Sequence, residues 1–330
     1  MNQQNKIITR SNVIADDYFA LLAQLYGESE AAHQYASDSR KGLEKVLGKS
    51  ADNPIFFQAR RQASLVGHIA LIPTSGSSAF FGFFECIDED CFALLWQELL
   101  GEAKTKGITS LFGPVNGTIW HPYRVVTSSV EAPFFPSESI SRLEYAGWLA
   151  NQKPLEVFEY HSAYRTDYTP IIVATRNSYQ NAIDSGVLLR TETIDTNNIQ
   201  ELYALAVEVF SQNPGYVHLS IEEFVALYSS DKISRNNATL YTARIDGKLV
   251  GFCLNLENNQ TLIMKTIAVA PNIQQKGIGN ALVHKIHIDA VASGFTKVIY
   301  ALVRKDNNVR HFPTDKITVF REYAAYQYKV

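Results

Sequence analysis

The feature that most constrains this chain is a set of short motifs that recurs at a nearly constant spacing. Each motif occurs once in each half, and the paired residues lie 184 to 187 positions apart. The three pairs are Tyr18 with Tyr203 in amphipathic segments, Gly67 with Gly251 after Leu-Val, and Gly107 with Gly294 after a long helical pattern. Independent accidents would not keep one spacing through three elements. The sequence therefore predicts two copies of one fold.

A fourth motif locates an insertion in the first copy. A Val-Phe pair followed by Glu-Tyr ends at Tyr160 in the first half and at Tyr323 in the second, a spacing of only 163 residues. The spacing falls by 24 residues after Gly107. We therefore expect an inserted loop in the first copy, at about residues 113–137.

The length of 330 residues fits two domains of ordinary size better than one core. We place the first domain at residues 1–165 and the second at residues 188–330. Residues 166–187 are predicted to be a linker that contains one short strand, at residues 171–174.

The pattern of helices and strands is clearest in the second copy. Apolar residues at helical spacing predict helices at about residues 197–210 and 276–293, and Ser220 with Glu223 predicts the capping box of a further helix. Asp246-Gly247 between two apolar runs predicts a β-hairpin. Strands in a row, followed by helix, strand, helix and strand, predict an α+β fold. Each copy is expected to have a mixed, mostly antiparallel sheet flanked by helices.

Composition narrows the class of partner and the compartment. Lys and Arg number 30 against 33 Asp and Glu, a net charge of −3, which disfavours a nucleic-acid partner because such proteins usually carry a basic surplus. The three cysteines, Cys86, Cys91 and Cys253, are too few for a disulfide framework and lack metal-ligand spacing. We predict a reducing compartment and no metal. Because no apolar run has the length of a signal peptide or a membrane span, we expect a cytoplasmic protein without a membrane partner.

One segment has the pattern of a ligand site. After an apolar strand that ends at about Val269, residues 274–280 read Gln-Gln-Lys-Gly-Ile-Gly-Asn and open a helix. Glycines allow close backbone approach, and the free N–H groups of a helix start form a cradle for an anion such as a diphosphate. A dinucleotide fingerprint does not fit this segment, because its third glycine would fall at Leu282.

The same segment resembles the acyl-CoA signature of the GNAT N-acyltransferase superfamily, Gln/Arg-x-x-Gly-x-Gly/Ala. Gln274, Gly277 and Gly279 occupy its three defined positions. The hairpin at Asp246-Gly247, followed by Leu-Val-Gly, is also typical of that family. The resemblance covers residues 188–312, and with the repeat it implies two tandem GNAT-like domains, of which the first is degenerate.

The resemblance implies that acetyl-CoA or CoA binds to the second domain as a co-substrate. Backbone N–H groups of the loop would hold the pyrophosphate, and the preceding strand would splay from its neighbour to take the pantetheine arm. The residues implied are Ile267, Ala268, Val269, Gln274, Gln275, Lys276, Gly277, Ile278, Gly279 and Asn280. An N–H of the strand would stabilise the acyl oxygen while a neutral primary amine attacks the thioester directly.

The catalytic pattern of that family is incomplete in this sequence. The family often has Asn at the start of the next helix and, about seven residues later, a Tyr that protonates the leaving sulfur. Asn307 and Asn308 fill the first position, but Thr314 and Asp315 stand where the Tyr is expected. We therefore name Asn308 and, in the last strand, Tyr323 as candidate catalytic residues. A packing role for Tyr323 and solvent-assisted proton transfer stay open.

The first copy has no counterpart of the glycine-rich loop. At a spacing of 187 residues, Gly277 corresponds to Asp90, and Asp88 and Glu89 precede it. Three carboxylates would repel a pyrophosphate, so we expect no acyl-CoA binding in this copy. Acidic residues at a helix start favour the helix dipole, and this interpretation is preferred to a metal site.

The inserted loop is rich in aromatic and polar side chains, and long loops of this kind are often functional. We predict that Asn116, Trp120, His121 and Tyr123 help to shape an acceptor-substrate pocket facing the CoA site. A packing loop between the domains is the alternative.

These features predict an acyl-CoA-dependent N-acetyltransferase, with acetyl-CoA as the simplest donor and a primary amine of a small molecule or peptide as the acceptor. Two alternatives stay open. One is a catalytically silent acyl-CoA-binding protein. The other is a Fem-type aminoacyl- or peptidyltransferase, which the acidic net charge and the intact CoA loop disfavour. A monomer and a homodimer are both compatible with the sequence.

Overall fold

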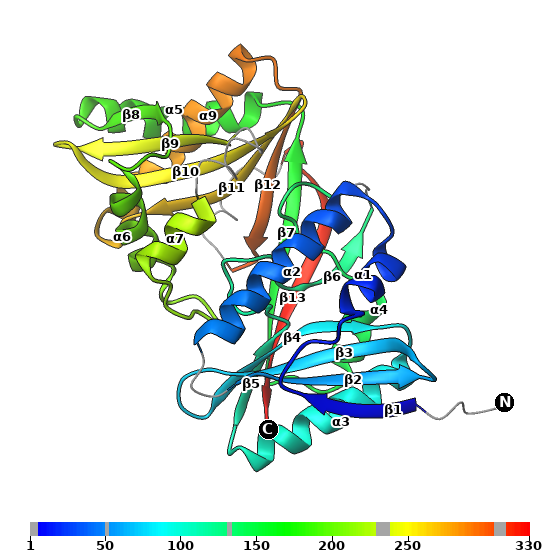
Figure 1. Cartoon of the computed structure of the whole chain (residues 1–330). Coiled ribbons are helices and arrows are strands. Elements are labelled where there is room, and N and C mark those ends of the chain that lie inside the picture. Colours follow the sequence, from blue (N-terminus) through cyan, green and yellow to red (C-terminus); the bar gives the residue numbers. More distant parts are fainter. Residues whose placement is uncertain (1–5, 50–52, 131–133, 229–237, 307–314) are drawn as a thin grey trace. The chain divides into compact units, whose positions relative to one another are not determined.

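The computed structural model describes residues 6–49, 53–130, 134–228, 238–306 and 315–330 (Figure 1). Internal packing divides the chain into two compact units: unit 1 comprises Met1–Glu159 with Glu322–Val330, and unit 2 comprises Tyr160–Arg321. These limits differ from the boundaries drawn from the sequence. The end of the last strand packs in unit 1, and the segment that precedes residue 188 packs in unit 2.

Unit 1 is built around a mixed sheet. Its elements are β1 (Lys6–Ser11), α1 (Tyr18–Tyr26), α2 (Glu30–Lys49), β2 (Ile55–Arg61), β3 (Ser64–Pro73), β4 (Ser78–Cys86), α3 (Glu89–Thr105), β5 (Ser110–Gly113), β6 (Val125–Ser129) and α4 (Glu144–Ala150), with the end of β13 (Thr318–Lys329). The strand order is β1-β2-β3-β4-β5-β13. β4 and β5 are parallel, and the other neighbours are antiparallel.

Unit 2 has the same kind of sheet. Its elements are the end of β7 (Glu156–Arg165), α5 (Thr169–Asp184), β8 (Leu188–Glu192), α6 (Ile199–Phe210), α7 (Ile221–Tyr228), β9 (Ala238–Ile245), β10 (Lys248–Asn258), β11 (Thr261–Val269), the 3₁₀ helix η1 (Pro271–Lys276), α9 (Ile278–Ala292) and β12 (Lys297–Arg304). The strand order is β8-β9-β10-β11-β12-β7. β11 and β12 are parallel, and the other neighbours are antiparallel.

The two units repeat one order of elements, which confirms the predicted repeat. The strands β2, β3 and β4 with helix α3 correspond to β9, β10 and β11 with helix α9, and the parallel pair β4–β5 corresponds to β11–β12. The sixth strand of each sheet comes from the other repeat, since β13 follows β12 along the chain and β7 follows β5 and β6. The predicted fold class, a tandem α+β protein with mixed, mostly antiparallel sheets, is confirmed.

The prediction of a linker at residues 166–187 is wrong, because α5 occupies most of this segment. Pro170 lies in the first helical turn, where proline is tolerated. Ile171, Thr175 and Ala182 form a buried face at helical spacing. The apolar residues 171–174, predicted to be a strand, lie in the first turns of this helix. α5 packs along α9 in unit 2.

Each unit has its own apolar core against the helix that follows its fourth strand. In unit 1 the rings of Phe92 from α3 and Trp148 from α4 stack, with their centroids 5.8 Å apart. In unit 2, α9 buries Ile278, Leu282 and Ile286. No helix within the described ranges is both long and apolar enough to cross a membrane.

Two local signals of the second copy form as predicted. The N–H of Ser220 donates to Oε2 of Glu223 at 2.7 Å, and the N–H of Glu223 donates to Oγ of Ser220 at 3.3 Å. This reciprocal pair is the capping box of α7. Asp246 and Gly247 have φ angles of 49° and 79° in the hairpin between β9 and β10.

Candidate functional site

The parallel strands β11 and β12 of unit 2 separate after a short ladder. Their pairing ends where Met264 faces Tyr300, although β11 continues to Val269 and β12 to Arg304. β11 stays paired with β10 as far as Val269. One edge of β11 therefore leaves β12 along residues 265–269, in the stretch where the splay is expected.

Helix α9 begins directly after this opening. Its N-cap is Gly277, whose φ of 76° and ψ of 9° lie in the left-handed region that glycine adopts without strain. As a glycine, this N-cap residue has no side chain with which to cap the helix. The N–H groups of a first helical turn have no acceptor within the helix, and the dipole makes this end favourable for an anion.

The start of α9 lies close to β10 and β11, and the approach is tightest at Gly251. A Cβ on Gly251 of β10 would lie 3.3 Å from the carbonyl oxygen of Ala268 and 3.3 Å from Cγ2 of Ile278. A Cβ on Gly279 would lie 3.7 Å from Cγ2 of Val269. The start of the helix is thus fixed at the open end of β11.

The structure gathers the predicted cofactor residues on one strand end, one connecting turn and one helix start. Ile267, Ala268 and Val269 end β11, Gln274, Gln275 and Lys276 lie in η1, and Gly277, Ile278, Gly279 and Asn280 open α9. Ala268 and Ile278 are buried and Lys276 is exposed. The arrangement can offer backbone N–H groups to a diphosphate and a strand edge to an extended arm.

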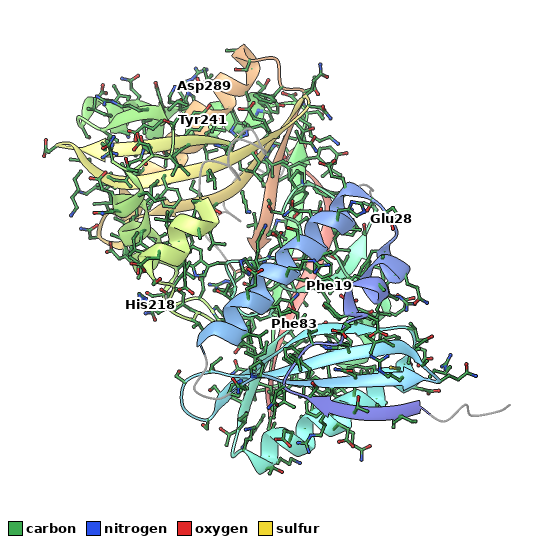
Figure 2. The ribbon with its side chains drawn as sticks, in the orientation of Figure 1. Phe19, Glu28, Phe83, His218, Tyr241 and Asp289 are labelled. Atoms are coloured by element: carbon green, nitrogen blue, oxygen red, sulfur yellow. The ribbon has the colours of Figure 1, made fainter. Side chains whose placement is uncertain are left out.

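The corresponding opening in unit 1 is filled by the chain itself. The pairing of β4 with β5 ends where Phe80 faces Phe112. The inserted loop then turns back against β4: the N–H of Val115 donates to the carbonyl oxygen of Phe81 at 2.8 Å. Oδ1 of Asn116 accepts from the N–H of Phe83, which lies on β4 (Figure 2), at 2.6 Å.

Glycines allow this loop to lie against its neighbours. A Cβ on Gly82 of β4 would stand 2.0 Å from the carbonyl oxygen of Val115, and a Cβ on Gly42 of α2 would stand 2.3 Å from that of Asn116. Such distances leave no room for a side chain. The loop segment at residues 115–116 therefore occupies, in unit 1, the place that corresponds to the open strand edge of unit 2.

The helix start of unit 1 is also satisfied from within. Asp88 is the N-cap of α3 and accepts from the N–H of Cys91 at 2.8 Å. Arg61 donates to the same carboxylate at 2.9 Å. Asp88 thus provides the negative charge that the helix dipole favours, as preferred from the sequence. Among the described residues, no group of three or more His, Cys, Asp and Glu side chains is arranged to hold a metal.

The predicted acceptor residues all lie in unit 1. Asn116, His121 and Tyr123 are buried, and Trp120 is half-buried. The amide of Asn116 is engaged at both ends, because Nδ2 donates to Oγ of Ser39 at 3.4 Å. The Tyr123 hydroxyl accepts from Arg124 at 2.8 Å. These contacts give the loop a packing function within its own unit, and its contribution to an acceptor pocket stays a prediction.

Of the two candidate catalytic residues, the described structure includes Tyr323. Tyr323 is 1% exposed, belongs to unit 1 and donates its hydroxyl hydrogen bond to Glu138. Asn308 lies outside the described residues. A catalytic role for either side chain stays a prediction.

Strand β4 carries a buried carboxyl group, that of Glu85, which is not among the residues predicted from the sequence. Glu85 is 1% exposed, and its carboxyl oxygens lie within hydrogen-bond distance of three tyrosine hydroxyls, those of Tyr26 at 2.6 Å, Tyr35 at 2.9 Å and Tyr145 at 3.1 Å. Burial raises the pKa of Glu85 to about 7, against the lowering effect of the three hydroxyls and of Arg142. The signal in the sequence is an acidic residue at the end of the apolar run Phe-Phe-Gly-Phe-Phe.

The hydrogen bonds around Tyr145 fit a protonated Glu85. The Tyr145 hydroxyl receives the N–H of Cys86 at 2.8 Å and has two acceptors within reach, the carbonyl oxygen of Cys86 at 2.9 Å and the carboxyl group of Glu85. A hydroxyl has only one proton to donate. A neutral Glu85 can supply the second, so that every group in this cluster is satisfied.

The second copy matches a known protein family in sequence. Residues 199–312 match the family model described as the acetyltransferase (GNAT) family. No curated protein matches the chain significantly in sequence.

Solved structures match nearly the whole chain. A tandem GNAT protein from the clavulanic acid biosynthesis pathway is 12% identical, with a TM-score of 0.55 and 98% of each chain covered. A GCN5-related N-acetyltransferase from Sphaerobacter thermophilus is 12% identical, with a TM-score of 0.52, and the match covers 98% of this chain and 95% of that one. A GCN5-related glucosamine N-acetyltransferase region in a fungal multi-domain β-N-acetylglucosaminidase is 14% identical, with a TM-score of 0.56. This last match covers 99% of the present chain, which spans 38% of the fungal one.

Residues 199–312 thus form a domain of the GNAT acetyltransferase family, and the chain as a whole has the tandem GNAT fold. At 12 to 14% identity, the likeness to the solved structures concerns the fold.

The pKa of Glu85 predicts how stability depends on pH. Its pKa is raised from 4.5 to about 7 in the folded protein, so the folded state keeps a proton that the unfolded chain has lost between these values. The free energy of unfolding should therefore fall by roughly 3 kcal/mol from pH 4.5 to pH 7 through this group. Glu85→Gln, which mimics the neutral acid, should remove this part of the pH dependence.

Urea unfolding of both proteins from pH 4 to pH 8 measures the difference. The same substitution at exposed Glu89 controls for a general charge effect. A constant difference between wild type and Glu85→Gln across this range would contradict a neutral Glu85.

Asn116→Ala should destabilise the protein by about 1–3 kcal/mol, because it leaves the buried N–H of Phe83 without its acceptor. Urea unfolding measures the change, and Asn53→Ala, at an exposed position of unit 1, is the control. Unchanged stability together with a raised KM for an amine acceptor would instead support the substrate-binding role predicted from the sequence.

Proposed function

We propose that this protein is an acyl-CoA-dependent N-acyltransferase whose co-substrate binds to unit 2. The observation that carries the proposal is the coincidence of two features: β11 leaves β12 beyond Met264, and the helix start at Gly277 stands at the open end of β11. A strand edge suits an extended arm that contains amides. A helix start suits a diphosphate. Coenzyme A combines both groups in one molecule.

The contrast between the units supports unit 2 as the binding unit. In unit 1 the inserted loop already bonds to β4 through Val115 and Asn116. The carboxylate of Asp88 caps α3 at the position where a phosphate would bind. Entry of CoA there would require both internal groups to be displaced. In unit 2 the N-cap of α9 is Gly277, which has no side chain to fill the corresponding position.

The reaction proposed is direct transfer of an acyl group, in the simplest case acetyl, to a primary amine. The amine nitrogen forms a bond to the acyl carbon while the bond from that carbon to sulfur breaks. The nitrogen loses a proton and the sulfur gains one. An N–H of β11 would stabilise the charge on the acyl oxygen. Because the Tyr323 hydroxyl donates a hydrogen bond to Glu138 in unit 1, we assign both proton transfers, from the nitrogen and to the sulfur, to solvent.

Substitution at the helix start tests the location of the co-substrate. Gly277→Glu should abolish binding of acetyl-CoA, because the position has a positive φ and the new carboxylate would stand where the diphosphate is expected. Asp90→Ala, in the first turn of α3 in unit 1, should leave the affinity unchanged. Isothermal titration calorimetry measures both affinities, and far-UV circular dichroism checks folding. Equal loss in the two variants would contradict the proposed division between the units.

A second candidate function is binding of acyl-CoA without turnover, and the hydrogen bond between Tyr323 and Glu138 favours it. A turnover assay distinguishes the two candidates. Wild type should release free thiol from acetyl-CoA when a primary amine from a small-molecule and peptide panel is added. Tyr323→Phe should keep the rate within about threefold of wild type, because solvent can protonate the thiolate. A loss of about a hundredfold or more would make Tyr323 the general acid. Acetyl-CoA binding without thiol release for any amine would support the second candidate.

A further inference from the structure

Helix α5 runs along α9 in the opposite direction. The hydroxyl of Tyr168, just before α5, donates to the carbonyl oxygen of Phe295, just beyond the end of α9, at 3.0 Å. In the middle of the pair, Oγ1 of Thr175 lies 3.1 Å from Nδ1 of His284. Later residues of α5 therefore reach the start of α9.

Ser178 of α5 contacts this start. A Cβ on Gly277 would lie 3.3 Å from both Cβ and Oγ of Ser178. Nδ2 of Asn280 donates to Oγ of Ser178 at 3.5 Å. The serine hydroxyl thus stands beside the first turn of α9, close to Gly277 and Asn280, which are both among the predicted cofactor residues.

The hydrogen-bonding capacity of Ser178 is incompletely used. A serine hydroxyl has one proton to donate and can accept two hydrogen bonds. Its contact with Asn280 uses an acceptor position. Within the described part of the chain, the hydroxyl proton has no acceptor. Ser178 is only half-buried, so a ligand at the helix start can reach it.

We propose that Ser178 donates a hydrogen bond to the diphosphate of the co-substrate, so that α5 forms part of the CoA site. This assignment rests on the proposed function of unit 2. It adds a side-chain donor from a preceding helix to the backbone donors of α9. Ser178 would contribute to recognition of the diphosphate and would have no effect on the pantetheine arm, which the strand edge of β11 holds.

The test compares two ligands that differ in the diphosphate. CoA carries it, and S-acetylpantetheine has the arm and the thioester without it. Ser178→Ala should weaken CoA binding about tenfold, the size expected for a hydrogen bond to a charged group. Ser178→Asp should weaken it at least about a hundredfold, because a carboxylate would then face the phosphates. Neither substitution should change the affinity for S-acetylpantetheine.

Asn177→Ala is the matched control, since Asn177 is the exposed neighbour of Ser178 on α5, and it should leave both affinities unchanged. Calorimetry measures binding, and thermal unfolding confirms that each variant is folded. If wild type binds CoA and both Ser178 variants bind it within about twofold of wild type, the assignment of Ser178 is wrong. Equal weakening of both ligands would also overturn it, because Ser178 would then act through the position of α9. If wild type does not bind CoA, the proposed function itself fails.

Discussion

A parallel strand pair that separates after a few residues leaves the backbone N–H and C=O groups along one strand edge without a neighbouring strand. The two units differ in which groups form hydrogen bonds with that edge. Backbone N–H and C=O groups need partners when water is excluded. In unit 1 the partners come from the same chain, since Val115 and Asn116 bond to β4. In unit 2 the corresponding part of β11 leaves β12 beyond Met264, and the proposed co-substrate would bind there. One geometry thus yields a closed unit and a unit able to hold a ligand.

The two units differ in the same way at the start of the helix that follows the separating strand, where backbone N–H groups need an acceptor. In unit 1 the carboxylate of Asp88 accepts from the first turn of α3, and Arg61 neutralises its charge. In unit 2 the N-cap is Gly277, which has no side chain to play this part. A group within the chain satisfies a helix start without the entropy cost of binding a separate molecule. In the first copy, internal groups therefore make the contacts both at the strand edge and at the helix start.

Much of the fold could be predicted from the sequence because it depends on local spacing. The repeat, the capping box at Ser220 and the hairpin at Asp246 all follow from residues close together in the chain, and each is present in the structure. Helix α5 could not be recognised in this way, since four apolar residues in a row fit either a strand or a buried helical turn. What makes it a helix is a face that packs on α9, a partner about a hundred residues later.

The sequence by itself determined that the chain contains two copies of an α+β fold and that only the second keeps a glycine-rich helix start, because glycine patterns and hydrophobic periods are local. The tertiary structure alone decided which groups meet across long separations. It assigned the end of β13 to unit 1, brought Val115 and Asn116 onto the edge of β4, and gathered three tyrosine hydroxyls around Glu85. These contacts join residues at least 33 positions apart in the sequence, and such pairings arise from packing rather than from any local pattern.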